Sequence, residues 1–440
     1  MRVALVSPNF YPKAGGVESH LIELLRSLRG VKFSVLTNWR PGIEKAYSLF
    51  PDVDFYFGWP ADRPIRRWFV WSRIAMAPYR GLRASLEILR TLNRRNWLRR
   101  IDADIFHFHH IDLDQADRIA SRLGMARALP RWYRWATEPA DDEAKTLLTD
   151  HTVFTAPEET VPEGAKRALL ETFANVVSVD AESFEVVKAF QRGHGGRAWF
   201  IPNSVDTDRF RNHEQNHHGF VVGYAARAGK SGDDLLESLI RRLGTEVRWR
   251  FALAGEEHDV RTAPMLKAAP RGDLCFNLSY LQMQEFYPTL DLLVNPFPGE
   301  GVGRTTLEAM SCGVPVIGVG TGDKYPIING KTGYLLPPDP DLVAHTIQEL
   351  VRSPEVLSEM GRQARSLIGA PIGGSAQSRT REREDQSEMS AQAKVYFAVD
   401  HSKGEYIHEA SNRKSGNQCN QIRHQTGLRV EDQGIENPLR

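Results

Sequence analysis

The sequence has few cysteines, no long apolar run and almost no net charge, and each absence excludes a class of protein. Among 440 residues there are three cysteines, Cys275, Cys312 and Cys419. Their wide spacing forms neither a metal motif nor a disulfide framework, so a reducing cytoplasm is the expected location. No apolar run reaches the roughly 20 residues of a membrane-spanning helix, and residues 3–6 are too short for the apolar core of a signal peptide. The net charge of +1 gives no general argument for nucleic-acid binding. We expect a soluble or peripheral protein.

Apolar runs alternate with helical patterns along most of the chain, which predicts an α/β protein. The length exceeds one ordinary hydrophobic core, so two doubly wound domains are expected. The runs that indicate buried strands of the first domain are 3–6, 32–37, 103–110, 146–152 and 176–179, and residues 17–25 have helical periodicity. The corresponding runs of the second domain are 220–224, 249–255, 291–295 and 315–317.

Composition sets the expected domain boundaries. We assign residues 1–198 to the first domain and 199–370 to the second, with the polar stretch 211–219 as a linker. Two similar α/β domains joined in this way imply a ligand cleft between facing strand ends. Residues 371–440 are rich in Arg, Glu, Gln, Ser and Asn, which is typical of a largely disordered tail.

The segment from Pro298 to Ile317 is the most informative part of the sequence. It places Glu300 and Glu308 around a glycine-broken loop that opens a short helix, with Glu308 expected in the first turn of that helix. Loop amides and a helix N-terminus suit an anionic or hydroxylated ligand. Carboxylates accept hydrogen bonds from paired hydroxyls, as on a sugar or a ribose. This combination favours a sugar-nucleotide site over the alternative of two solvated acids.

The motifs of residues 1–368 resemble, in order, those of the retaining glycosyltransferases of sequence family four, which have the GT-B architecture. The Glu-x7-Glu segment matches the family signature, and four further segments resemble its other motifs: Pro12 to Glu18, Ile201 to Phe210, Gly223 to Lys230 and Phe251 to Glu256. The resemblance implies two Rossmann-like domains that face each other. It also implies a nucleotide-sugar donor on the second domain and an acceptor on the first.

The resemblance also implies roles for individual residues. Glu300 would contact the sugar hydroxyls, Glu308 the ribose, and Arg227 and Lys230 the diphosphate, without a metal ion. The backbone around the donor would come from Gly15, Gly16, Gly301, Val302, Gly303, Arg304 and Thr305.

Two features depart from the family pattern. The spacing from Arg227 to Lys230 is shorter than usual, and the sequence of the tail does not predict the helices that normally cross back to the N-terminal domain. Residues 339–368 would then have to make that crossing alone, unless the C-terminus is altered.

Several histidines compete for a place in the cleft. His151 follows a strand and matches a family histidine near the donor sugar, which makes it the preferred candidate. His107, His109 and His110 are alternatives, although a lone histidine is more often structural. A metal site at His213, His217 and His218 is disfavoured, because these residues lie in the polar linker without acidic or cysteine partners.

Residues 63–100 mix arginines with Trp and Leu and contain almost no acids. Such a segment can bind an anionic membrane surface. An ordinary solvated helix is an equally good interpretation, and nucleic acid is a third that nothing else supports.

The sequence therefore predicts transfer of a sugar from a nucleotide-sugar donor to a glycan or glycolipid acceptor, and the resemblance implies that the anomeric configuration is retained. No cofactor is expected, since the nucleotide-sugar is a co-substrate. The expected location is the cytoplasm, with the inner face of the cell membrane as one place within it. Two other classes stay open: a sugar-nucleotide epimerase or hydrolase, and a catalytically impaired binding protein.

Overall fold

The structure is a computed structural model of the chain. It describes residues 1–12, 15–28, 30–58, 89–109, 128–141, 145–155, 161, 163–211, 219–229, 232–255, 257–261, 263–269, 272–297, 303–320 and 326–369. All of them belong to one compact unit, Met1–Pro371. The linker candidates 212–218 and the tail 370–440 lie outside the described residues.

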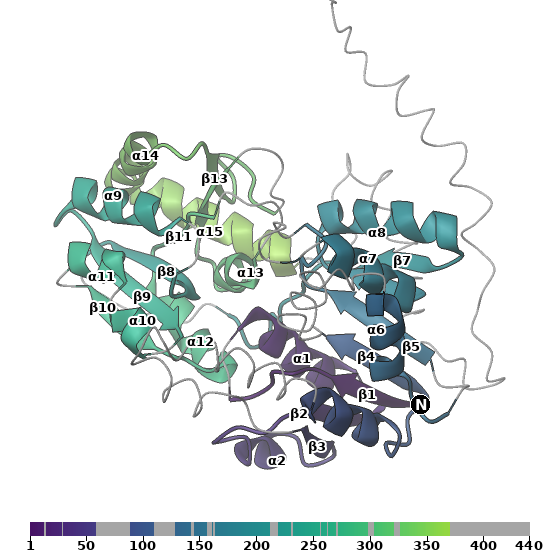
Figure 1. Ribbon diagram of the computed structural model, residues 1–440. Helices are drawn as coiled ribbons and strands as arrows, with labels where there is room; N and C mark the ends of the chain where they lie inside the picture. Colours follow the sequence, from purple (N-terminus) through teal and green to yellow (C-terminus); the bar gives the residue numbers. More distant parts are fainter. Residues whose placement is uncertain are drawn as a thin grey trace, which may run out of the picture. The chain divides into compact units, whose positions relative to one another are not determined.

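The N-terminal half forms a seven-stranded parallel sheet flanked by helices (Figure 1). Its strands are β1 Arg2–Val6, β2 Lys32–Asn38, β3 Asp54–Gly58, β4 Ile105–His109, β5 Lys145–Asp150, β6 Asn175–Ser178 and β7 Arg197–Phe200, in the order β3-β2-β1-β4-β5-β6-β7. The helices with described bounds are α1 Gly16–Ser27, α2 Lys45–Leu49, α6 Leu129–Thr137, α7 Glu163–Thr172 and α8 Ala181–His194. The boundary expected between residues 198 and 199 falls inside β7.

A six-stranded parallel sheet follows. Its strands are β8 Val221–Arg227, β9 Arg248–Ala254, β10 Asp273–Phe276, β11 Leu292–Asn295, β12 Val316–Val319 and β13 Gly333–Leu336, in the order β10-β9-β8-β11-β12-β13. The helices are α9 Asp233–Leu243, α10 Glu257–Arg261, α11 Pro264–Ala268, α12 Tyr280–Phe286, α13 Arg304–Ser311, α14 Pro340–Arg352 and α15 Pro354–Gly369, with the 3-10 turn η3 Tyr287–Thr289. The predicted α/β class and two doubly wound sheets are confirmed.

Each sheet reverses its winding direction at one place. The first reverses between β1 and β4, and the second between β8 and β11. Open α/β sheets bind ligands at the carboxyl ends of the strands at such switch points. Gly15 and Gly16 follow β1, Arg227 ends β8, and the Glu300 loop follows β11, so the expected site residues belong to the two switch points.

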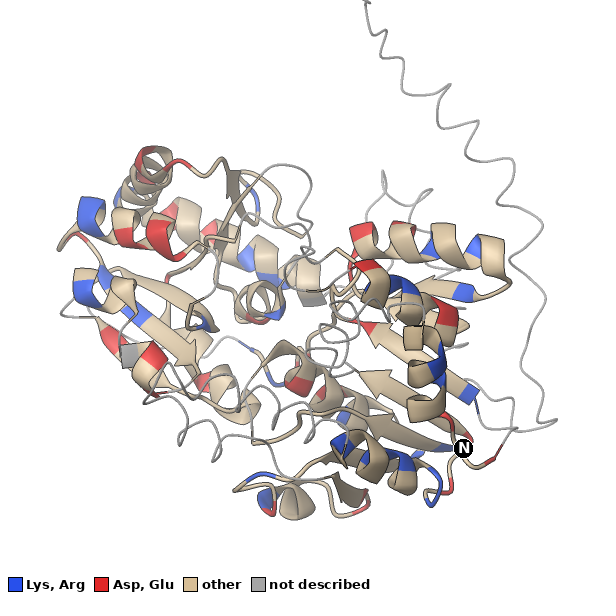
Figure 2. Ribbon diagram, in the orientation of Figure 1, with Lys and Arg blue, Asp and Glu red and all other residues tan. Residues whose placement is uncertain are grey.

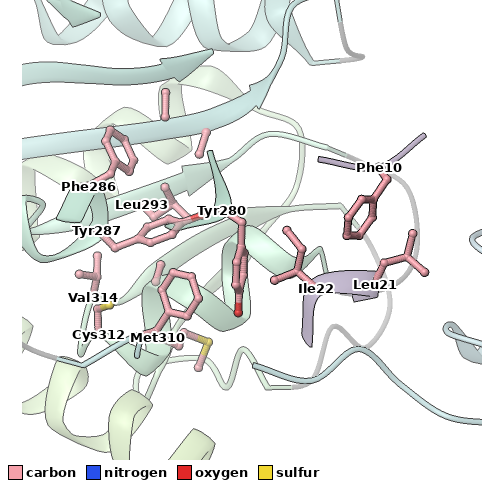
Figure 3. Close-up of a cluster of buried hydrophobic side chains, with 14 of the residues drawn as sticks. Phe10, Leu21, Ile22, Tyr280, Phe286, Tyr287, Leu293, Met310, Cys312 and Val314 are labelled. Carbon is pink, nitrogen blue, oxygen red and sulfur yellow. The ribbon is translucent and has the colours of Figure 1, made fainter. Parts of the chain in front are cut away.

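One apolar cluster includes side chains from both halves. Leu21 and Ile22 of α1 belong to the same cluster as Tyr280, Tyr287 and Met310 (Figure 3). The C-terminal helix α15 adds polar contacts, since the Arg365 guanidinium donates to the carbonyl oxygens of Thr207 and Phe210 at 3.0 and 2.6 Å. Among the described helices, none is both long and apolar enough to cross a membrane.

Candidate active site

Two turns from strand to helix provide most of the expected site residues. α1 begins at Gly16, directly after Gly15, and α13 begins at Arg304, directly after Gly303. Gly303 has no side chain to cap α13, so the first amides of this helix suit an anionic group. Thr305 is half-buried in the first turn. Glu300, Gly301, Val302 and Lys230 lie outside the described residues.

Arg227 reaches from the end of β8 to the start of α1. Its Nη2 atom lies 3.2 Å from Oε2 of Glu18. Glu18 is a buried residue of α1, and acidic residues are red in Figure 2. The Arg227 side chain is 51% exposed, whereas that of Glu18 is 2% exposed. A Cβ atom built on Gly15 would lie 2.0 Å from the same Nη2 atom. The structure therefore brings Gly15 and Arg227 together. The guanidinium fits at this position because Gly15 has no side chain.

Arg304 makes a second, buried connection between the halves. Its guanidinium forms an ion pair with Glu23 of α1 and donates to the backbone oxygen of Ser204 at 3.1 Å. The Tyr280 hydroxyl also donates to Glu23, at 2.7 Å. Sequence reasoning expected Arg304 to provide a backbone amide and missed both Glu23 and Tyr280. The signal for Glu23 was an acid between the apolar residues Ile22 and Leu24.

Glu308 lies in the second turn of α13, not in the first as predicted, because the helix begins only at Arg304. Its carboxylate is buried and accepts a hydrogen bond from the Tyr287 hydroxyl at 2.7 Å. Arg304 Nε lies 3.6 Å from the other oxygen. Burial raises the pKa of Glu308 to about 7, although the Arg304 charge and the Tyr287 hydrogen bond oppose that rise. The carboxyl therefore changes its charge near neutral pH.

The histidines gather at the carboxyl end of the first sheet. His109 ends β4, and His151 directly follows β5, the neighbouring strand. His109 Nδ1 lies 3.3 Å from His151 Nε2. His20, which sequence reasoning did not single out, projects from α1 against both rings. His107 bonds instead to the Thr149 hydroxyl at 2.7 Å.

Burial keeps the imidazoles of His20, His107 and His109 uncharged. It lowers the pKa of both His20 and His107 to about 3 and that of His109 well below its usual value. The other candidates, His110, His213, His217 and His218, lie outside the described residues.

Known proteins match both halves of this fold. Residues 218–353, which include β8 to β13, match the family model described as "Glycosyl transferases group 1". A lipopolysaccharide core biosynthesis mannosyltransferase of Rhizobium meliloti is 23% identical over 352 residues, covering 77% of this chain and 84% of the relative. A phosphatidyl-myo-inositol mannosyltransferase of Mycobacterium tuberculosis is 23% identical over 372 residues, covering 79% and 86%.

A third relative matches over a shorter segment. The trehalose synthase of Pyrococcus horikoshii is 28% identical over 149 residues, which are 34% of this chain and 31% of that protein.

Solved structures share the fold over most of the chain. The structure of Anabaena HepE in complex with UDP and glucose has a TM-score of 0.56 at 14% identity, covering 88% of this chain and 99% of that one. TarM has a TM-score of 0.59 at 11% identity, covering 87% and 98%. The family model, the relatives and the shared fold agree with the resemblance to glycosyltransferases found in the sequence. Residues 218–353 form a domain of the kind described as "Glycosyl transferases group 1", and the chain is a glycosyltransferase with the GT-B fold.

Proposed function

We propose that the protein transfers a sugar of the mannose type from a nucleotide-sugar donor to a lipid-linked acceptor, with retained anomeric configuration. One observation supports the donor site above the others: Arg227, at the switch point of the second sheet, lies against Gly15, at the switch point of the first. A diphosphate placed there would meet a half-exposed guanidinium and the amides that begin α1 and α13. The names of the two relatives that match over most of their length favour a mannosyl donor and a lipid-borne acceptor.

In this proposal, charge stabilisation does most of the catalysis. The bond from the anomeric carbon to the phosphate oxygen breaks, and a bond from that carbon to the acceptor oxygen forms on the same face of the sugar. The acceptor proton passes to the leaving phosphate, whose charge Arg227 and the helix amides stabilise. His151 would position the acceptor hydroxyl, and Glu300 and Lys230 would hold the sugar and the diphosphate.

Three described carboxylates, those of Glu18, Glu23 and Glu308, favour this front-face route over a double displacement. Glu18 accepts from Arg227, Glu23 from Arg304 and Tyr280, and Glu308 from Tyr287. A carboxylate that acts as a nucleophile would have to leave such a partner. The acidic groups nearest the helix N-termini are therefore better suited to hold cationic and hydroxyl groups in place. We propose that the reaction needs no metal ion.

The decisive experiment is a thermal-shift screen of the full-length protein against UDP-, GDP- and ADP-sugars. A transfer assay follows, with the nucleotide-sugar that raises the melting temperature of the protein most. A GDP-sugar is expected to raise the melting temperature, and transfer to a glycolipid extract is expected in the presence of EDTA. NMR of the product would report the anomeric configuration. Turnover of the donor without any acceptor would instead favour an epimerase or hydrolase, and binding without transfer would favour an impaired binding protein.

We also propose that residues 63–100 hold the enzyme at an anionic membrane surface. Within this segment, residues 89–98 form a helix whose Leu89 and Leu92 are 41% and 45% exposed. Arg95 turns inward, with its guanidinium over Trp135 and paired with Glu138, so it would contribute little. Residues 59–88 lie outside the described residues. Co-sedimentation with anionic liposomes, weakened by salt and absent with neutral liposomes, is the expected result; equal binding to both kinds would contradict the proposal.

A further inference from the structure

Three histidines from separate elements converge beside the start of α1. His20 comes from the second turn of α1, His109 from the end of β4, and His151 from the residue after β5. Each can offer one ring nitrogen, and the three nitrogens lie within 4.8 Å of one another. The set consists of imidazoles alone, so it differs from the acidic clusters that are common on protein surfaces.

The arrangement of the rings suits a shared central ion. The ring centroids are 5.4 Å apart for His20 and His109, 5.2 Å for His20 and His151, and 5.6 Å for His109 and His151. The centre of this nearly equilateral triangle lies about 3.1 Å from each centroid. An ion bound about 2.0–2.1 Å from an imidazole nitrogen lies roughly 3.2 Å from the centre of that ring. The spacing of the rings therefore leaves room for an ion at the centre, and bonds to that ion would replace the contact between His109 Nδ1 and His151 Nε2.

Two of the rings contain a buried nitrogen that lacks a partner. His20 is 8% exposed and His109 is 0% exposed, and the Nε2 atom of each has no hydrogen-bond partner among the described residues. A buried polar atom without a partner loses the hydrogen bonds that it would make to water, and a bound ion would restore that interaction. The same burial that leaves these atoms unpaired also keeps the imidazoles neutral, which is the state that binds metals.

The surroundings allow a cation. Arg304 is the positive side chain that acts on His20, but it is itself paired with Glu23 and Glu308. His107 lies next to His109, with ring centroids 3.9 Å apart, and bonds to Thr149, so it would support the site without being a ligand. His151 is half-buried, which leaves one side of the triangle open to water.

We propose that His20, His109 and His151 form a site for a borderline divalent ion of the Zn²⁺ class, with water as the fourth ligand. Three neutral imidazoles favour Zn²⁺, Co²⁺ or Ni²⁺ over Mg²⁺ or Ca²⁺, which prefer oxygen ligands. The ion takes no part in sugar transfer. It would instead bind a ring nitrogen of His151. His151 would then no longer position the acceptor hydroxyl, so transfer stops while the ion is bound. This second consequence rests on the proposed function, whereas the metal site itself does not.

Binding is tested with Co²⁺ on the full-length protein after treatment with EDTA. One Co²⁺ per chain is expected, with the visible absorption band of a tetrahedral or five-coordinate site. His20→Asn and His109→Gln should each weaken binding at least tenfold, whereas the control His345→Asn, on the exposed face of α14, should leave it unchanged. Circular dichroism shows whether each variant is folded. Equal Co²⁺ affinity in wild type and in the folded His20→Asn/His109→Gln double variant would overturn the proposal, as would the absence of a visible band.

Inhibition provides a separate readout. Zn²⁺ should stop transfer by the wild type, and EDTA should restore it. The His109→Gln variant, compared with its own metal-free rate, should need at least tenfold more Zn²⁺ for the same inhibition. If Co²⁺ binds as expected but no transfer is found with any donor, the metal site stands and the proposed function fails. If transfer occurs and Co²⁺ does not bind, the metal site fails alone.

Discussion

The guanidinium of Arg304, at the start of α13, forms a buried ion pair with Glu23 of α1, so the helix after the expected donor loop is bonded to the first helix of the other sheet. Tyr280 shares the same carboxylate. Removing one partner of a buried pair is far more costly than losing an exposed pair, and without Glu23 the Arg304 guanidinium would keep only the longer contact to Glu308, at 3.6 Å.

Glu23→Ala is therefore expected to lower the free energy of unfolding by about 3–5 kcal/mol. Glu237→Ala is the matched control, because Glu237 pairs with Arg241 on the outer face of α9. That change should cost no more than about 0.5 kcal/mol. Urea denaturation of both variants measures the difference, and similar losses would show that the Glu23 pair is not a buried connection.

Arg227→Ala should reduce kcat/KM for transfer at least 100-fold, since it removes the cation proposed to stabilise the leaving diphosphate. The melting temperature should change little, because the side chain is half-exposed. Arg248→Ala is the control: Arg248 is a similarly exposed arginine at the other end of the same sheet, paired with Asp273. Steady-state kinetics on both variants decides the matter, and wild-type turnover in Arg227→Ala would refute the assigned role.

Gly15→Ala tests whether the missing side chain matters. The backbone at Gly15 is extended, with φ 165°, so alanine adopts it without strain. Its Cβ would nevertheless lie 2.0 Å from Arg227 Nη2 and 2.3 Å from Glu18 Oε2, and Arg227 would have to move. Donor KM should rise at least tenfold while the protein stays folded.

Gly193→Ala is the control for that change, because nothing lies within 4 Å of a Cβ at this position of α8. It should keep full activity and add roughly 0.5–1 kcal/mol of stability. Unchanged donor KM in Gly15→Ala would show that the contact with Arg227 has no function.

Tyr287→Phe should destabilise the protein more at pH 8 than at pH 5. The pKa of Glu308 is raised to about 7, so the folded protein favours the protonated carboxyl. The protonated carboxyl adds to the free energy of unfolding below its ordinary pKa of 4.5, and this addition is lost as the pH rises through about 7. The Tyr287 hydroxyl stabilises the charged form, so its loss should cost about 1.5–3 kcal/mol at pH 8 and about 0.5–1.5 kcal/mol at pH 5. Urea denaturation at the two pH values measures this. Tyr47→Phe, on the exposed side of α2, should show no such dependence.

Acid should destabilise the metal-free protein through the histidines. Because the pKa of His20 in the fold lies near 3, its contribution is present above the ordinary value of 6.5 and is lost as the pH falls toward 3. Each such histidine makes the free energy of unfolding fall by up to about 1.4 kcal/mol for each pH unit toward acid. His20→Asn should flatten the stability curve between pH 6 and pH 4, and His345→Asn should not. Equal slopes in all three proteins would show that His20 is not buried in its neutral form.

The central strands of both sheets were predictable from sequence, and the edges were not. β1, β4, β8 and β11 are short apolar runs, because both faces of a central strand are covered. The four strands without a predicted run, β3, β7, β10 and β13, form the four edges of the two sheets. Their residues are mostly half-buried or exposed, so no apolar pattern marks them.

The candidate site was predictable where its residues are neighbours in the sequence. Gly15 and Gly16 are consecutive residues at the start of α1, and residues 303–308 are consecutive at the start of α13, so the local sequence pattern indicates them. Glu23, Tyr280 and Tyr287 were missed because each acts through a partner far away in the chain, and each alone resembles an ordinary residue of an amphipathic helix. The roles of Glu300 and Lys230 stay predictions.

The close approach of Gly15 and Arg227 also has an evolutionary consequence. A side chain at position 15 and an arginine at position 227 would overlap in space. Which substitutions are tolerated at either position therefore depends on the residue at the other. Related enzymes without glycine at position 15 should therefore also have a residue other than arginine, such as a shorter one, at position 227. A protein engineer who wishes to place a side chain at position 15 would therefore have to change position 227 with it.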